Sequence, residues 1–453
     1  MRIFKNKTLG RVLSLLSIVL LIIGMDQGLG YLLEPIETVS YASYLNHDIR
    51  QLEKAGEKAD AIFVGASRTH CTFDPAVFED ELGLRCVINT GLPGQTINCT
   101  YYLTKDMIER LHPDRVYIGV MIDSLLEGED DIQQRLMTLD RMSLKNKIPM
   151  ALDCFAPEEM LYFFKTYRYS YQLSSEQIKM NIYEKTALRE TGAHLRGGDP
   201  ERGDTEEYIG KGFVDYWSSC PTGTIPIKGA VDFSPDKVSD DKLKYLDACV
   251  EVCKKNGVEP VLVTGVTSVM RMYACTGYQE ATDFYKSYAE ANGIKYYNLN
   301  YMKERESLLP DDKMYDYNHC NGEGAHIASE FFAQIVKKEE AGEDVSQYFY
   351  RDLDDLKKSV KRIVAVGAEI SEGKRENTVH ISIESLHNDD VTPLYRVLIC
   401  GDGGNEYSAV QDWTRESELE IELGDAPSYM IKVEAGAEDR SYGTASQEYT
   451  YEK

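Results

Sequence analysis

Hydrophobic and polar positions alternate early in the chain in blocks that are typical of a parallel α/β sheet. Short apolar runs at residues 61–64, 86–88 and 116–122 predict buried strands. Residues 75–82 follow an aspartate–proline pair and stop at a glycine, and residues 96–111 are closed by His-Pro, so both segments are predicted as helices. Strand, helix, strand, helix, strand is the order of a doubly wound parallel sheet.

The same alternation resumes in the second half of the chain. An amphipathic helix is expected over residues 239–256, followed by a strand at 259–264 and a helix at 278–292. A last strand is expected at 295–299, and a helix over residues 325–336 closes the domain. We therefore predict one three-layer α/β domain over residues 34–338. Within it, residues 41–58 are expected to form a helical connector that leads into the first strand.

Residues 124–222 interrupt this domain with a segment that lacks the alternation. Its part from 152 to 171, rich in Phe and Tyr, is expected to be helical, and residues 185–212 are charged and glycine-punctuated like a long loop. Because loops of more than about 15 residues are uncommon in compact domains unless they are functional, we interpret the insertion as a lid or substrate wall.

The C-terminal region has a different pattern. A charged segment, residues 339–361, is expected to be a helical linker. Seven short strands separated by Gly, Asp and Asn turns then follow, at residues 362–370, 378–386, 394–400, 406–413, 417–423, 429–434 and 448–451. Their spacing predicts a β-sandwich of the immunoglobulin or fibronectin type over residues 362–453, whose role could be carbohydrate binding, partner binding or that of a spacer.

The N-terminal segment, residues 1–33, differs from the rest of the chain. Four basic residues precede the apolar run Val12–Met25: Arg2, Lys5, Lys7 and Arg11. A basic flank before an apolar segment keeps the N-terminus in the cytoplasm and sends the rest across the membrane. No small-x-small cleavage site follows closely, so we favour an uncleaved membrane anchor over a removed signal peptide or a buried core helix.

Composition narrows the possible partners. The 453 residues include 75 acidic and 50 basic ones, a net charge of −25, which argues against nucleic acid as a partner.

Ten cysteines in an exported chain permit disulfides without requiring them. Cys249 and Cys253 lie four apart on a predicted helix and are better explained as core thiols than as metal ligands. Without paired CxxC or HExxH motifs, neither a metal nor another cofactor is expected.

Candidate chemistry lies at the ends of two predicted strands. Gly65 and Ala66 break the first strand and place Ser67 on a turn at its carboxyl end, the edge where open α/β sheets bind ligands. Asp316 and His319 are three apart in a loop after the last strand, so they can supply the base and the orienting carboxylate of a Ser-His-Asp system. Taken one at a time, each of these residues could equally be an ordinary turn, cap or surface residue.

Four blocks in order resemble a known family: VGASRT, NTGLPGQT, a strand ending in Asp123, and DYNHCNGEGA. They look like the SGNH/GDSL hydrolases, in particular the membrane-anchored, envelope-facing branch similar to alginate O-acetylation proteins and D-alanyl-teichoic acid transfer proteins. The resemblance covers residues 59–336 apart from the insertion. It implies a flavodoxin-like α/β/α fold.

The resemblance also implies roles for individual residues. The family's nucleophile falls on Ser67, and its Asp-x-x-His pair falls on Asp316 and His319. Its oxyanion-hole glycine falls on Gly94, so the backbone amides of Ser67 and Gly94 would both donate to the oxyanion. The family's third block has an oxyanion asparagine where this chain has Ile122. Losing one such donor from a working oxyanion hole costs on the order of 3 to 4 kcal/mol. Another donor would have to substitute, or the protein would be slow, selective or inactive.

The expected function is that of an extracytoplasmic SGNH-type serine esterase or O-acyltransferase. Its expected partners are an acylated polysaccharide or other ester, the membrane through the N-terminal helix, and a membrane-bound acyltransferase. An inactive SGNH-like protein that binds glycan or an acylation partner is the alternative. A nucleotide site on residues 91–94 has little support, because a single Gly-x-x-Gly turn lacks the rest of a dinucleotide fingerprint.

Overall fold

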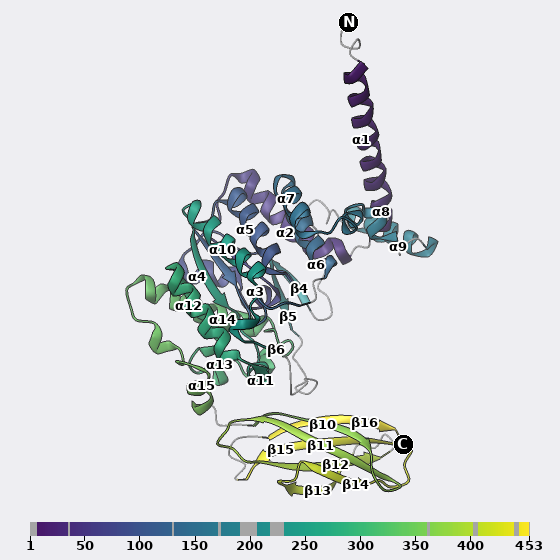
Figure 1. Ribbon diagram of the computed structural model, residues 1–453, viewed down its shortest axis with the longest axis vertical. Helices are drawn as coiled ribbons and strands as arrows, with labels where there is room; N and C mark the ends of the chain where they lie inside the picture. The colour runs from purple at the N-terminus through teal and green to yellow at the C-terminus, as the bar shows by residue number, and fades with distance from the viewer. Residues whose placement is uncertain are drawn as a thin grey trace.

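The computed structural model has an N-terminal helix, an α/β domain and a C-terminal β-sandwich (Figure 1). Helix α1 (Lys7–Leu33) projects away from the α/β domain, and the sandwich lies at the opposite end of the molecule. The structure describes residues 7–34, 37–128, 131–170, 174–190, 206–217, 231–359, 363–401, 406–438 and 444–452.

The α/β domain is built on a five-stranded sheet in the order β2-β1-β3-β7-β9, in which every neighbouring pair is parallel. Its strands are β1 (Ala61–Val64), β2 (Val87–Asn89), β3 (Arg115–Gly119), β7 (Glu259–Thr264) and β9 (Lys295–Asn298). The sequence order reverses next to β1, which is the switch point at which open α/β sheets bind ligands. The predicted flavodoxin-like fold class is therefore confirmed.

Helices cover both faces of the sheet. Strand β1 contributes apolar side chains to the core on each face. Ile62 and Val64 point into one core with helices α5 and α10. Ala61 and Phe63 point into the other core with α4 and α14. A fully buried parallel strand therefore carries apolar residues on both faces. The covering helices are α4 (Pro75–Leu82), α5 (Ile97–Leu111), α10 (Asp240–Lys255), α12 (Tyr278–Asn292) and α14 (Gly322–Glu340).

The remaining elements complete the domain. They are α2 (Glu37–Ala55), α3 (Ser67–Thr72), η5 (Pro235–Lys237), β6 (Val231–Asp232), α11 (Val269–Ala274), β8 (Cys275–Thr276), η6 (Leu299–Tyr301), α13 (Arg305–Leu308) and η7 (Asp311–Lys313). Helix α4 shows how local signals set element bounds. The Asp74 carboxylate accepts a hydrogen bond from the Ala76 N–H, and Gly83 ends the helix.

The insertion is more regular than the sequence predicts. It contains α6 (Ile132–Arg141), α7 (Leu144–Cys154), η2 (Glu159–Phe163), α8 (Lys165–Arg168), α9 (Ser175–Glu190), β4 (Glu206–Gly210) and β5 (Phe213–Tyr216). The helical segment expected over residues 152–171 is broken into three pieces, because α7 ends at Cys154 before an Ala-Pro pair that disfavours helix, and η2 and α8 follow. The loop expected over residues 185–212 is wrong at both ends: α9 continues to Glu190, and β4 pairs with β5. The middle of that loop lies outside the described residues.

The C-terminal domain packs two antiparallel sheets, β10-β11-β14 and β13-β12-β15-β16, around one apolar core. Its strands are β10 (Ile363–Glu372), β11 (Thr378–His387), β12 (Pro393–Gly401), β13 (Ser408–Thr414), β14 (Glu418–Glu422), β15 (Ser428–Ala437) and β16 (Thr444–Glu452). The expected helical linker is only partly helical, because η8 (Ser346–Tyr348) and extended residues separate α14 from α15 (Leu353–Ser359).

Candidate active site

Ser67 follows strand β1 after the two turn residues Gly65 and Ala66. Gly65 makes the sharp turn with φ +151°, and a Cβ there would lie 3.0 Å from the Cα of Gly119 on the neighbouring strand. Only glycine tolerates both the dihedral angle and the close approach. Ser67 is then the first residue of α3, at the carboxyl edge of the sheet.

Asp316 and His319 lie in the loop between η7 and α14. The loop is closed on itself by a hydrogen bond from the Tyr315 N–H to the His319 carbonyl, at 2.8 Å. Asn321 then caps α14 by accepting a hydrogen bond from the Gly324 N–H at 2.9 Å. The loop therefore presents its side chains at the same sheet edge as Ser67.

The structure brings Ser67, His319 and Asp316 into one hydrogen-bonded chain. The Ser67 Oγ lies 2.7 Å from the His319 Nε2, and the His319 Nδ1 lies 2.8 and 2.9 Å from the two carboxylate oxygens of Asp316. Burial alone would raise the pKa of Asp316. Hydrogen bonds from the His319 ring and from the N–H groups of Asn318 and His319 outweigh it and hold that pKa below its usual value. An ionised Asp316 fixes the Nδ1–H tautomer, so that Nε2 can accept the Ser67 proton.

A second set of contacts holds this loop from behind. The Tyr317 carbonyl accepts hydrogen bonds from the Thr267 Oγ1 at 3.1 Å and from the Ser268 Oγ at 2.8 Å. Tyr317 also packs at the edge of a small cluster in which Val269 of α11 meets Val364 of β10. The β-sandwich thus contacts the element that supports the Asp316–His319 loop.

The backbone N–H groups of Ser67 and Gly94 are the oxyanion donors that the family resemblance implies. The N–H groups of Ser67 and Gly94 take part in no hydrogen bond within the described part of the chain. Gly94 has φ +64° in the turn after β2, a left-handed conformation that glycine adopts without strain. The Gly91 N–H, by contrast, already donates to the Asn89 Oδ1 at 3.0 Å.

Ile122 adds no donor to this pair. Strand β3 ends at Gly119 rather than at residue 122, so Ile122 lies in the following turn. Its side chain is 4% exposed and packs in an apolar cluster with Phe233 and Met272. The position of the family's oxyanion asparagine is therefore apolar in the folded chain as well as in the sequence.

Arginine side chains beside the nucleophile were missed by the sequence interpretation. Arg68 is 4% exposed, its Nε has no hydrogen-bond partner, and its Nη2 donates to the Asn318 Oδ1 at 3.4 Å. Arg271 is 7% exposed, stacks 5.6 Å from the Tyr317 ring centroid and lies 3.7 Å from an oxygen of Asp123. The only sequence signal was Arg68 itself, inside the VGASRT block. Arg271 is thus paired with Asp123, whereas Arg68 is a buried cation next to the nucleophile in the chain.

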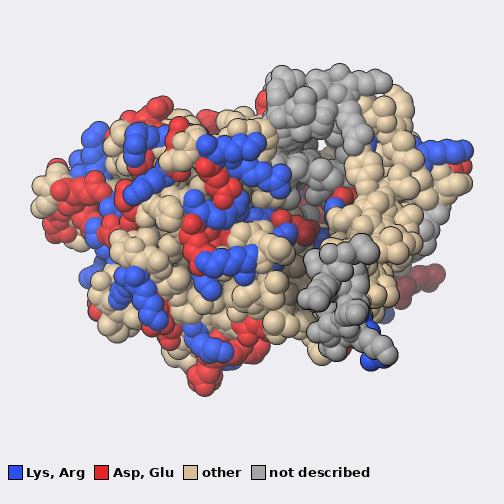
Figure 2. All heavy atoms as spheres, turned by 90° about the horizontal axis from the view of Figure 1, so that it is seen from above, with Lys and Arg blue, Asp and Glu red and all other residues tan. Residues whose placement is uncertain are grey.

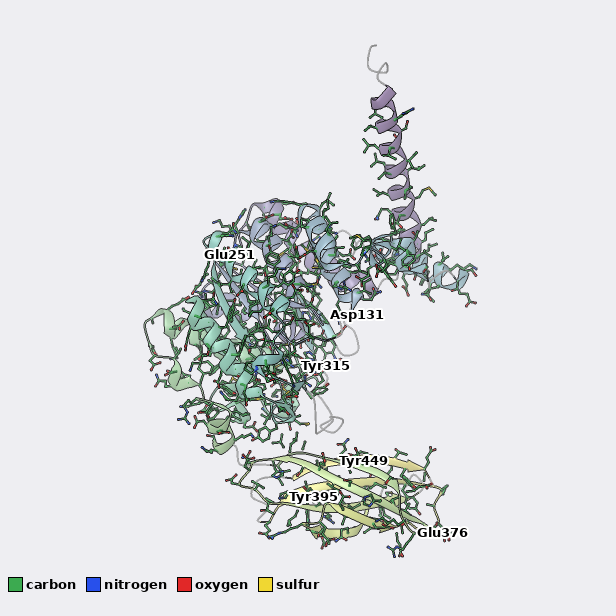
Figure 3. The ribbon with its side chains drawn as sticks, viewed as in Figure 1. Asp131, Glu251, Tyr315, Glu376, Tyr395 and Tyr449 are labelled. Carbon is green, nitrogen blue, oxygen red and sulfur yellow. The ribbon has the colours of Figure 1, made fainter. Side chains whose placement is uncertain are left out.

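Aromatic rings line the other edge of the site. The Tyr216 ring, from strand β5 of the insertion, lies 4.8 Å from the Tyr315 ring and 6.3 Å from the His70 ring. Burial and the charges of Arg141 and His319 lower the pKa of His70 to about 3, so that this ring is neutral. Figure 3 shows Tyr315 on the side of the domain that also carries Asp131, at the start of α6.

The nine described cysteines are all buried, and Cys249 and Cys253 are core residues on α10. Within the described ranges, no group of three or more His, Cys, Asp or Glu side chains could hold a metal ion.

Comparisons with known proteins give matches only among solved structures; no family model and no curated protein matches the chain. A protein assigned to the G-D-S-L lipolytic family, from Desulfitobacterium hafniense, is 13% identical and matches over 60% of this chain and 97% of its own, with a TM-score of 0.30. A GDSL-like lipase from Bacteroides thetaiotaomicron is 14% identical over 65% of this chain and 99% of its own, with a TM-score of 0.29. At these scores the matches do not bear on activity, and the chemistry of the site rests on its own geometry.

Proposed function

We propose that this protein is an extracytoplasmic SGNH-type serine esterase or O-acyltransferase that acts on acyl esters of a cell-envelope or exported polysaccharide. The observation that carries the proposal is the 2.7 Å contact between the Ser67 Oγ and the His319 Nε2, with Asp316 on the other ring nitrogen. A nucleophile, a base and an orienting carboxylate at one sheet edge are the parts that acyl transfer requires.

The reaction follows from these positions. His319 takes the Ser67 proton while the Oγ attacks the ester carbonyl, and the N–H groups of Ser67 and Gly94 donate to the oxyanion. When the tetrahedral intermediate collapses, the C–O bond of the ester breaks and His319 returns the proton to the leaving alcohol. The resulting acyl-enzyme passes its acyl group to water, as an esterase, or to a sugar hydroxyl, as an O-acyltransferase.

Arg68 takes over part of the role of the missing asparagine in this proposal. It follows the nucleophile directly, is buried and keeps an unpartnered Nε. A fixed cation in a poorly solvated site lowers the energy of a negative charge that develops nearby. Arg68 would act through its charge, at longer range than the hydrogen bonds of the backbone amides.

The proposed location rests on α1. Residues 10–33 form one helix with mean hydropathy 2.1, long and apolar enough to cross a membrane, a property that signal sequences share. The basic residues before it favour an N-terminus in the cytoplasm and a domain outside. Tyr216 and Tyr315 beside the catalytic loop offer flat apolar faces with polar edges, which suit a sugar ring.

A binding protein of an envelope acylation system is the second candidate, and the buried apolar Ile122 is the observation that favours it. Such a protein would retain the fold and its partners, which include a membrane-bound acyltransferase, without turnover. The two candidates differ in whether Ser67 reacts.

The test uses the full chain in detergent. We expect wild-type protein to be labelled by a fluorophosphonate and to hydrolyse 4-nitrophenyl acetate, and we expect Ser67→Ala to lose both, by about 10³-fold or more in kcat. Ser359→Ala, which changes an exposed serine on α15, is the matched control and should behave like wild type. Folded wild-type protein that neither labels nor turns over would reject the enzyme and leave the binding protein.

A further inference from the structure

The last two turns of α1 are held by the insertion. Asp26, 7% exposed, accepts hydrogen bonds from the backbone N–H groups of Lys165 and Thr166 at 3.0 and 2.9 Å. Gly30 lies against the same segment, where a Cβ would come within 2.3 Å of the Lys165 Cβ. The start of α8 is thereby fixed at the level of residue 26.

Helix α9 binds the end of α1. The Asn181 side-chain amide donates to the Leu32 and Leu33 carbonyls at 3.2 and 3.0 Å. The Lys185 ammonium donates to the Glu34 carbonyl at 2.6 Å and to the Tyr31 carbonyl. Carbonyls at a helix end have no intrahelical partner, so these side chains cap α1 and tie it to the insertion.

Residues 10–25 of α1 make no such contacts with the described part of the insertion, and the part of the helix before Asp26 matches a bilayer in length. From Lys7 to Met25 the helix rises by roughly 28 Å at about 1.5 Å per residue, close to the hydrocarbon thickness of about 30 Å. The apolar side chains along it point outward, from Leu13 at 41% to Leu20 at 68% exposed. A membrane crossed by this segment would have its surface near Asp26, beside α8 and α9.

The segments around this level expose apolar side chains of their own. We call them the apolar collar: Leu161, Phe164, Tyr167, Met180, Ile182 and Tyr183, which are between 40% and 71% exposed. Across the described ranges outside α1 and residues 124–222, Val410 is the only large apolar side chain exposed to a comparable degree, at 36%. Figure 2, which views the molecule from the α1 end, shows charged residues crowded over the α/β domain and few around α1, α8 and α9.

We propose that the apolar collar lies in the interfacial layer of a lipid bilayer and fixes the catalytic domain against the membrane surface. The occupant is lipid because the collar continues the outward apolar surface of α1, through Leu29 at 51% and Tyr31 at 39% exposed. Two of its members are tyrosines, whose amphipathic rings favour the headgroup level. Large exposed apolar patches on a soluble surface would otherwise be unfavourable. This inference rests on α1 being retained as an anchor, which the hydrogen bonds of α8 and α9 to its end support.

Tryptophan quenching by brominated lipids tests the collar directly. The full chain is reconstituted into phosphatidylcholine vesicles with or without brominated acyl chains, and the fluorescence of single substitutions is compared with the wild-type background from Trp217 and Trp413. We expect Met180→Trp and Tyr183→Trp to be quenched at least twofold. Val410→Trp, at the exposed apolar position on the sandwich, is the matched control and should not be quenched.

Leu20→Trp, in the middle of α1, separates the possible failures. If Leu20→Trp is quenched while Met180→Trp and Tyr183→Trp behave like Val410→Trp, α1 spans the bilayer but the collar does not contact lipid and instead faces a protein partner or a second copy. If Leu20→Trp is not quenched either, both the membrane anchor and the lipid-facing collar are rejected. The serine chemistry is unaffected in both cases, because Ser67 reactivity is measured separately with the fluorophosphonate.

Discussion

The two halves of the candidate active site differ in how completely they are built. On the nucleophile side, Ser67, His319 and Asp316 form an unbroken hydrogen-bonded chain, and the loop behind them is held through Tyr317. On the oxyanion side, only the backbone N–H groups of Ser67 and Gly94 are proposed as donors, and Ile122 is packed in an apolar cluster. Activating a nucleophile and stabilising the negative charge that its attack creates require different groups. This protein has a complete set of groups for the first role and fewer for the second. The four predictions that follow each change one half.

Asp316→Asn tests the nucleophile half and should have the largest effect. An asparagine can hold the imidazole only in the wrong tautomer, so that Nε2 would carry a proton and could not accept one from Ser67. We expect kcat for an aryl acetate to fall by about 10⁴-fold, with fluorophosphonate labelling slowed in parallel. Asp312→Asn, at an exposed carboxylate in the same region, serves as the control. Unchanged turnover in folded Asp316→Asn would remove Asp316 from the mechanism.

Arg68→Gln tests whether charge compensates for the incomplete oxyanion half. Removing the buried cation should lower kcat by about 10- to 100-fold and leave KM almost unchanged, because the developing negative charge exists only in the transition state. Arg68→Lys keeps the charge and should recover part of the loss. A change confined to KM would instead assign Arg68 to substrate binding.

Ile122→Asn would fill the gap in the oxyanion half. A side-chain amide at this position should raise kcat by about tenfold, less than the 10²- to 10³-fold that an evolved donor is worth, because the surrounding cluster is not arranged to orient it. Ile122→Leu is the matched apolar control and should leave kcat unchanged. The melting temperatures of both variants show whether the apolar cluster tolerates the exchange. If folded Ile122→Asn gains nothing, the oxyanion forms away from this turn.

The pH dependence of stability gives the smallest effect. The pKa of Asp316 is lowered in the folded protein, so its ionised form contributes stability above the unfolded value of about 3.9, and that contribution is lost as the pH falls through the lower folded value. The unfolding free energies of wild type and Asp316→Asn should therefore differ by a constant amount above about pH 5 and converge below about pH 4. Because the carboxylate is one-third exposed, we expect the difference to stay under about 1 kcal/mol. A gap that widens in acid would contradict the lowered pKa.

Local signals in the sequence were sufficient for much of the fold. The bounds of β1, α4, β7 and α12 were predicted to the residue, because each combines an apolar pattern with a cap, a glycine or a proline at its ends. The insertion was not predictable in this way. Helices α8 and α9 expose apolar side chains and bind the end of α1 through polar contacts, so a periodic pattern of buried positions does not identify them.

The sequence by itself determined which residue types could carry the chemistry: a serine after a strand, an Asp-x-x-His loop, a glycine turn and an isoleucine in place of a donor. Only the tertiary structure decided that Ser67 and His319, 252 positions apart, lie within hydrogen-bond distance, and that the Arg68 side chain is buried and donates to Asn318 of the same loop. The physical reason is the different range along the chain over which the two kinds of interaction act. Turn and cap preferences act over a few residues, whereas the crevice forms where loops from separate strands meet at one edge of a parallel sheet.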